Sequence, residues 1–239
     1  MAAGSLGAQT ESGVQKPKVA QTAQAPKREQ SPKKAEQAAE PGSAAGEGAA
    51  PARPALIAAS DLAGFDGLSA GRRGLIEAAL KVARESPWLP YKFGGSCPAD
   101  GGFDCSGAMW HVLKKVGLTP PRTSAAQYTW VEEESHLNKA AVGALDLKAP
   151  SMAALQPGDL LFWSGTYVPS DGRGVNITHV AIYLGREKSD GNPVMINATN
   201  GRTYRGKKAN GYGVYDFRLP RGNSARAVFV GYGTPPGLK

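Results

Sequence analysis

A glycine-rich loop that leads directly into an apolar helix constrains this chain more than any other feature of its sequence. The loop spans residues 94–102, and apolar residues then recur at helical spacing from Cys105 to Val116, with Gly117 in the position of a C-cap. Cys105 is therefore placed at a helix N-terminus, where unpaired backbone N–H groups and the helix dipole favour an anion. Because the thiolate is the nucleophilic form of cysteine, we expect Cys105 to be a nucleophile. The alternative is a buried structural cysteine, since free cysteine behaves as a small apolar residue.

The remaining pattern predicts helices first and strands later. A helix is expected from near Ser69 up to Pro87, and Thr123 or Ser124 should cap a short helix through Trp130. Strands are predicted at residues 160–163, 179–184, 194–198, 212–217 and 227–232, with a connection at 131–154 and a long loop at 164–177 that could form a lid or a wall. This order is typical of an α+β fold in which N-terminal helices pack on an antiparallel sheet.

Composition divides the chain into parts. Residues 1–54 are rich in Ala, Gln, Glu, Lys, Pro and Gly and contain no aromatic ring, so we expect a disordered low-complexity tail. Residues 55–68 are interpreted as a linker and residues 69–239 as the folded domain. No run of about 18 apolar residues exists, so no transmembrane segment is expected. The N-terminus also lacks the apolar core of a signal peptide.

Charge and cysteine content limit the possible partners. The net charge is +8, and basic residues crowd into residues 202–226, which favours an anionic partner: nucleic acid, an anionic membrane or an acidic cell-wall polymer. Basic and aromatic residues do not interleave as in nucleic-acid modules, so no nucleic acid is expected. Two cysteines, Cys97 and Cys105, are too few for a disulfide framework. A single bridge between them would silence the nucleophile and stays open as an alternative.

A cysteine nucleophile needs an imidazole base, and the chain has three histidines. His111 follows Cys105 by six residues on the same helix, about 120° around its axis, so it cannot face the thiol. His136 lies in an acidic, polar connection and is interpreted as a solvated residue. His179 opens a predicted strand directly after a loop, and we therefore expect it to be the base. A capped or solvated residue at a strand end is the alternative.

The neighbouring strand offers a third polar group. Asn197 lies in the predicted strand 194–198, where an amide is unfavourable unless it is paired. A hydrogen bond with the far nitrogen of the His179 ring would satisfy it and would orient the imidazole. The alternative is an Asn that marks the strand end before the turn at residues 199–201.

Five blocks in order resemble the successive motifs of the NlpC/P60 cell-wall peptidases. They extend over roughly residues 70–232 and comprise Pro90-Tyr91 with Gly94-Gly95, Phe103-Asp104-Cys105-Ser106-Gly107, Pro121-Arg122-Thr123-Ser124 with Gln127, Leu155-Gln156-Pro157-Gly158-Asp159-Leu160, and His179-Val180-Ala181-Ile182-Tyr183-Leu184-Gly185. The resemblance implies a papain-like α+β fold in the catalytic domain 69–239. It also implies a cysteine endopeptidase that hydrolyses peptidoglycan stem peptides, typically between γ-D-glutamate and a diamino acid.

Carried over by position, the resemblance makes Cys105 the nucleophile, His179 the base and Asn197 the third residue. The family more often has His at the third position, and Asn can also orient an imidazole. No metal or cofactor is expected.

Three further positions match the pocket for the N-terminal side of the substrate. They are Tyr91, Asp104 and Ser106. If the substrate is a stem with a free L-alanine amino group, Asp104 would pair the ammonium. A stem still attached to sugar would lack that pairing.

The resemblance implies a secreted or cell-envelope protein whose partner is peptidoglycan or its stem peptides. Two other functions stay open. One is an amidase or acyltransferase of the same fold that acts on other amides. The other is a catalytically idle module whose basic C-terminal region binds an anionic cell-wall polymer.

Overall fold

A computed structural model describes residues 52–85, 88–141, 146–219 and 227–239 of the 239-residue chain. Of the tail predicted at 1–54, residues 1–51 lie outside the described residues, as does Pro87. The residues predicted as a linker, 55–68, pack on the domain. Their short 3₁₀ helices, Ala59–Asp61 (η1) and Phe65–Gly67 (η2), are part of a segment that buries Ile57, Leu62 and Phe65 in the core.

In the described part of the chain, three α-helices precede most of the sheet, in line with the prediction. They are α1 (Ala70–Glu85), α2 (Cys105–Lys115) and α3 (Ser124–Glu133). The Thr123 side chain caps α3 by accepting a hydrogen bond from the Ala126 N–H. Helix α3 continues three residues beyond Trp130, because Val131 still packs in the core.

Helix α2 ends where the sequence indicates. Gly117 adopts a φ of 81°, and its N–H donates to Lys114 O while the Leu118 N–H donates to Leu113 O. These two bonds form a Schellman motif, whose left-handed residue is favourable for glycine.

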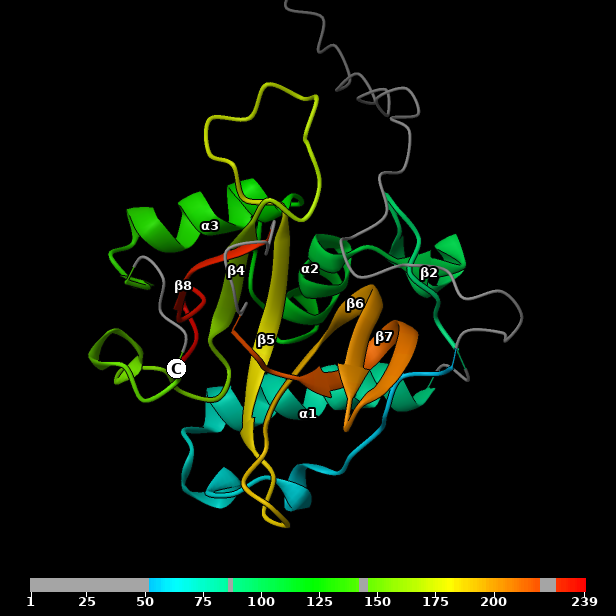
Figure 1. Cartoon of the computed structure of the whole chain (residues 1–239), viewed down its shortest axis with the longest axis vertical. Coiled ribbons are helices and arrows are strands. Elements are labelled where there is room, and N and C mark those ends of the chain that lie inside the picture. Colours follow the sequence, from blue (N-terminus) through cyan, green and yellow to red (C-terminus); the bar gives the residue numbers. More distant parts are fainter. Residues whose placement is uncertain (1–51, 86–87, 142–145, 220–226) are drawn as a thin grey trace, which may run out of the picture. The chain divides into compact units, whose positions relative to one another are not determined.

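The predicted antiparallel sheet is confirmed, and among the described residues it has six strands in the order β3-β8-β4-β5-β6-β7. Its strands are β3 (Leu137–Lys139), β4 (Leu160–Ser164), β5 (His179–Arg186), β6 (Pro193–Tyr204), β7 (Lys207–Asp216) and β8 (Val228–Gly233). Figure 1 labels the strands from β8 to β7. The five predicted strands correspond to β4 to β8. Strand β3 was missed inside the connection predicted at 131–154, because its three residues are ordered by pairing with β8 and not by any apolar pattern.

The strands differ from the prediction mainly in length. Strand β5 continues through Gly185, where a break in the register with β6 and a φ of 106° mark a bulge instead of an end. Strands β6 and β7 form a longer hairpin than predicted, with its turn at Arg205-Gly206. In the outer part of this hairpin, apolar and polar residues do not alternate regularly along the sequence, since polar residues lie on both faces.

A second, two-stranded sheet forms inside the glycine-rich loop. Strands β1 (Ser96–Cys97) and β2 (Gly102–Phe103) pair across the 3₁₀ helix Pro98–Asp100 (η3). A further 3₁₀ helix, Pro150–Met152 (η4), lies before β4. The loop that precedes Cys105 is therefore a compact structure and not an open linker.

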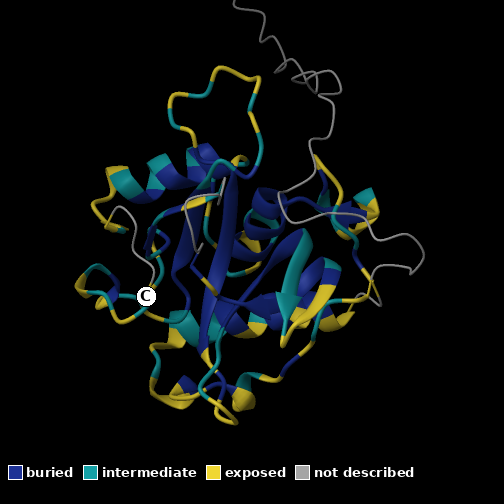
Figure 2. Cartoon of the chain, viewed as in Figure 1, coloured by how far each residue is buried: buried dark blue, intermediate teal, exposed yellow. Residues whose placement is uncertain are grey.

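The large sheet separates two apolar cores, and its central strands are buried (Figure 2). On the helix-covered face, Val180, Ile182 and Leu184 of β5 pack with α1, α2 and α3. On the other face, Ala181 and Tyr183 pack with aromatic residues of β4, β7 and β8. Successive side chains of β5 therefore enter opposite cores, as the pleat of a strand requires. Within the described residues, no helix is both long enough and apolar enough to cross a membrane.

Candidate active site

The candidate nucleophile occupies the first turn of α2. Cys105 is the first residue of the helix and is 6% exposed. Its Sγ lies 3.8 Å from the carbonyl oxygen of Thr178, the residue immediately before β5. The thiol and the start of β5 are therefore neighbours, although they are 73 residues apart in sequence.

The Asp104 side chain caps this helix and is fully engaged. Its Oδ1 accepts from the Gly107 N–H at 2.6 Å, from Ser106 Oγ at 3.3 Å and from Arg122 Nη1 at 3.1 Å. Its Oδ2 accepts from the Gly94 N–H and from Arg122 Nη2, each at 2.9 Å. A carboxylate has about four lone-pair sites, so this one is saturated by the protein itself.

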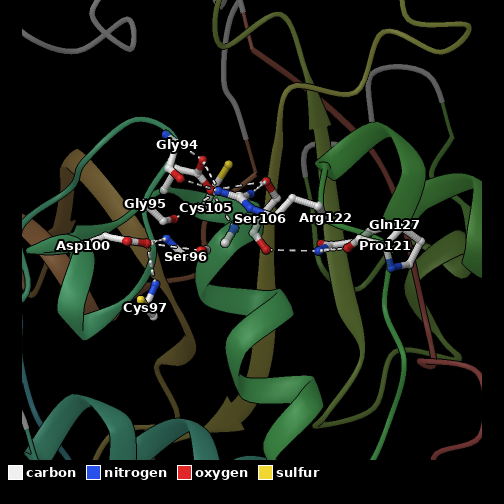
Figure 3. Close-up of polar contacts among 12 residues, drawn as sticks. Gly94, Gly95, Ser96, Cys97, Asp100, Cys105, Ser106, Pro121, Arg122 and Gln127 are labelled. Carbon is white, nitrogen blue, oxygen red and sulfur yellow. Dashed lines mark hydrogen bonds and ion pairs between the residues drawn. The ribbon is translucent and has the colours of Figure 1, made fainter. Parts of the chain in front are cut away.

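Arg122 joins the loop, the nucleophile turn and the segment before α3. Besides Asp104, its guanidinium donates to Ser106 Oγ at 3.0 Å and to the carbonyl oxygens of Gly94 and Gly95 at 3.0 and 3.2 Å. Gln127 adds a second link, because its Nε2 donates to Ser106 O and to Pro121 O (Figure 3). Both residues lie in a predicted motif, but the sequence assigned them no role.

The candidate base and its orienting residue lie together. His179, the first residue of β5, and Asn197 of β6 are both fully buried. The His179 Nε2 lies 2.6 Å from the carboxamide of Asn197. Trp163 of β4 packs against the imidazole, with ring centroids 5.5 Å apart. The Asn197 amide, which is expected to need a partner, therefore contacts the imidazole of His179. Trp163 keeps solvent from one side of that imidazole.

The other two histidines have different surroundings. His111 packs on Phe103, and burial together with the charges of Lys115 and Lys114 lowers the pKa of its imidazole. His136 is exposed, and its Nδ1 lies 3.3 Å from Thr234 O.

Both cysteines are free thiols, so the alternative of a Cys97–Cys105 bridge is wrong for this structure. Cys97 belongs to the small sheet, where its N–H and that of Ser96 donate to Asp100 Oδ2. Burial of Cys105 follows from its place on the apolar stripe of α2, as the structural alternative also predicted.

The structure gathers the predicted binding residues on one side of α2. Asp104 and Ser106 share the Arg122 guanidinium. Tyr91 is half-buried, pairs with Phe103 through a β-bridge and donates its backbone N–H to Asn210 Oδ1.

The loop 164–177 contributes two further residues to the candidate site, Tyr167 and Arg173, which the sequence did not identify. The Arg173 guanidinium donates a hydrogen bond to the Tyr167 hydroxyl. Within the described ranges, no group of three His, Cys, Asp or Glu side chains is placed to hold a metal.

Comparison with known proteins identifies relatives of this arrangement. The chain is 35% identical over 115 residues to the bifunctional muramidase/DL-endopeptidase CwlT of Bacillus subtilis, a match that covers 48% of this chain and 28% of that protein. It is 32% identical over 98 residues to the gamma-DL-glutamyl hydrolase of the same species, covering 41% and 18%. A solved NLP/P60 lipoprotein-like structure from Staphylococcus aureus is 27% identical, with a TM-score of 0.39 and coverage of 69% and 41%.

The matches to these two curated relatives span less than a third of their length. A sequence profile described as the NlpC/P60 family matches residues 88–216, more than half of the chain. The matched segment contains Cys105, His179 and Asn197. The chain therefore belongs to the NlpC/P60 family, and its helices and antiparallel sheet form the papain-like α+β fold of that family.

Proposed function

We propose that this chain is a cysteine endopeptidase that hydrolyses an amide bond in peptidoglycan stem peptides, with Cys105, His179 and Asn197 as its catalytic residues. The observation that supports this most is the 2.6 Å contact between Asn197 and the His179 Nε2. His179 is the first residue of β5, and the carbonyl oxygen of the residue before it, Thr178, contacts the Cys105 thiol. A buried imidazole held in one orientation beside a thiol at a helix N-terminus is suited to nucleophilic catalysis.

The proposed reaction has two steps. His179 takes the thiol proton through Nδ1, and the thiolate attacks the carbonyl carbon of the scissile amide. This step requires the neutral ring to carry its hydrogen on Nε2 and to donate it to Asn197 Oδ1, with the carboxamide turned over from the Nδ2–Nε2 contact of the structure. Backbone N–H groups at the α2 N-terminus would stabilise the oxyanion. The imidazolium returns its proton to the leaving nitrogen as the C–N bond breaks, which leaves a thioester on Cys105. Water, deprotonated by His179, then releases the acyl group as a carboxylic acid.

The substrate class follows from family membership and from the relatives' names. A DL-endopeptidase and a gamma-DL-glutamyl hydrolase are both among the matches, so we propose the γ-D-glutamyl bond to a diamino acid as the bond that is cut. Peptidoglycan or its stem peptides would be the partner and the cell envelope or exterior the location.

Pairing of a substrate ammonium with Asp104 stays a prediction. It would require Arg122 to share a carboxylate that is already saturated. An intact glycan-linked stem needs no such pairing, so the Asp104–Arg122 ion pair favours that substrate over a stem with a free amino group.

Mass spectrometry of digested peptidoglycan tests the proposal. Incubation of purified sacculi with the wild-type chain is expected to release fragments whose masses place the cut after γ-D-glutamate, with Cys105→Ala as the inactive control. Fragments cut elsewhere in the stem would correct the bond. Unchanged sacculi, with binding retained, would favour the idle binding module instead.

A further inference from the structure

The loop between β4 and β5 is tied to the nucleophile through its final residues. Ile177 O accepts from Arg173 Nη1 at 2.6 Å and from Ser124 Oγ at 3.0 Å. The next carbonyl, Thr178 O, is the one that contacts the Cys105 thiol. Arg173 therefore reaches back from the loop to a backbone segment that touches the candidate nucleophile.

Arg173 also fixes a tyrosine. Its guanidinium is held by two bonds to Asp171, at 2.8 and 2.6 Å, and its Nη2 donates to the phenolic oxygen of Tyr167 at 2.9 Å. Only 13% of the Arg173 side chain is exposed, whereas its partner Asp171 is 52% exposed, so the ion pair lies at the surface with the guanidinium on its buried side. No residue in the described part of the chain accepts the phenolic hydrogen of Tyr167. The Tyr167 hydroxyl thus has its oxygen anchored and its hydrogen available.

Tyr167 extends from this anchor to the loop that precedes Cys105 in the sequence. Its ring meets that of Phe93 edge to face, with centroids 6.4 Å apart. Phe93 is 50% exposed and directly precedes Gly94, whose N–H donates to Asp104. The two rings therefore connect the loop 164–177 with the loop that precedes Cys105, and the Phe93 ring stays partly open to solvent.

The protonation state of the Tyr167 phenol suits a hydrogen-bond donor. Burial raises the pKa of Tyr167 most, and the nearby Cys105 charge raises it further, against a lowering by Arg173. Because its pKa is raised, the Tyr167 hydroxyl keeps its hydrogen throughout the neutral pH range.

We propose that Tyr167 is a substrate-binding residue that donates its phenolic hydrogen to a backbone carbonyl of a peptide bound at Cys105, with Arg173 as the residue that positions it. The inference rests on the proposed function and extends it to substrate recognition. The Phe93–Tyr167 pair would contact an apolar part of the same peptide, and the loop 164–177 would act as a wall of the site, one of the two roles predicted for it.

Tyr167→Phe tests the proposal, since it removes only the hydroxyl and keeps the ring against Phe93. With purified stem peptide, kcat/KM is expected to fall about tenfold, the usual worth of one hydrogen bond to a neutral group. The matched control is Tyr204→Phe, which removes a hydroxyl that donates to Glu187, beyond the end of β5 opposite to His179, and should leave kcat/KM unchanged. A Tyr167→Phe variant with wild-type kcat/KM would overturn the inference.

A double-mutant cycle separates positioning from a general structural role. Arg173→Met should lower kcat/KM in the wild-type background but add little to Tyr167→Phe, because both act through the same hydroxyl. Fully additive losses would overturn the positioning role, with thermal unfolding recorded for each variant to account for lost loop contacts.

Failure of this inference is distinguishable from failure of the proposed function. An inactive Cys105→Ala together with an unimpaired Tyr167→Phe rejects the role of Tyr167 alone. An active Cys105→Ala rejects the proposed chemistry and, with it, this inference.

Discussion

Replacing Cys105 by alanine is expected to lower kcat/KM on stem peptides about 10³-fold or more while the protein stays folded. Without the sulfur, no thioester can form, and His179 has no thiol proton to accept. Loss of one member of a coupled catalytic set costs nearly as much as loss of all. The fold should persist, since alanine suits the apolar surroundings of a side chain that is 6% exposed. Product release measured by chromatography, with circular dichroism as the folding check, gives the result.

The chain contains its own matched control for this variant. Cys97→Ala removes the other free thiol, from the small sheet and not from the start of α2. We expect that variant to keep wild-type kcat/KM. If Cys105→Ala and Cys97→Ala were equally active, Cys105 would not be the nucleophile.

Gly107→Ala is expected to lower the free energy of unfolding by about 3 kcal/mol, at the upper end for an overpacked site. A Cβ at this position would lie 2.0 Å from Gly95 O and 2.9 Å from both Arg122 Nη2 and Asp104 Oδ1. Gly95 O cannot move without loss of its bonds from the Asp104 N–H and Arg122. Because these bonds hold the first turn of α2, activity should also fall. Thermal and urea unfolding measure the change.

Gly74→Ala is the helical control. Gly74 lies inside α1, and a Cβ there meets nothing within 4 Å. Because alanine is the better helix former, this variant should gain about 0.5–1 kcal/mol. Equal stability of the two variants would show that the close approach of Gly95 O does not control the nucleophile turn.

The apolar pattern predicted most of the elements but not all their ends. Periodicity located α1, α2 and β4 to β8, since each buries a continuous apolar face. It missed β3, which has no apolar alternation, and the outer part of the β6–β7 hairpin, which hydrogen bonding between the strands extends past the apolar residues. The strand predicted at residues 179–184 stops short of Gly185, because a glycine within a strand and a glycine after it look alike in the sequence until the bulge is seen.

The site could be predicted only where chemistry and local sequence coincide. Cys105 at a helix start, and an amide on a strand next to that of His179, could both be deduced from residue type and element. The role of Arg122 could not be deduced from the sequence, because it depends on which distant loop its guanidinium contacts in the folded chain. Tyr167 and Arg173 lie in an irregular loop, and no periodic pattern indicates where such side chains point.

The rate at which Cys105 is alkylated shows most directly whether the imidazole of His179 ionises its thiol. Iodoacetamide labelling near pH 6, followed by mass spectrometry of the peptides containing Cys97 and Cys105, compares both thiols in one molecule. Cys105 is the more buried of the two, yet the account predicts that it reacts faster, and that His179→Ala removes this advantage. Slower labelling of Cys105 than of Cys97 in the wild type, unchanged in His179→Ala, would contradict it.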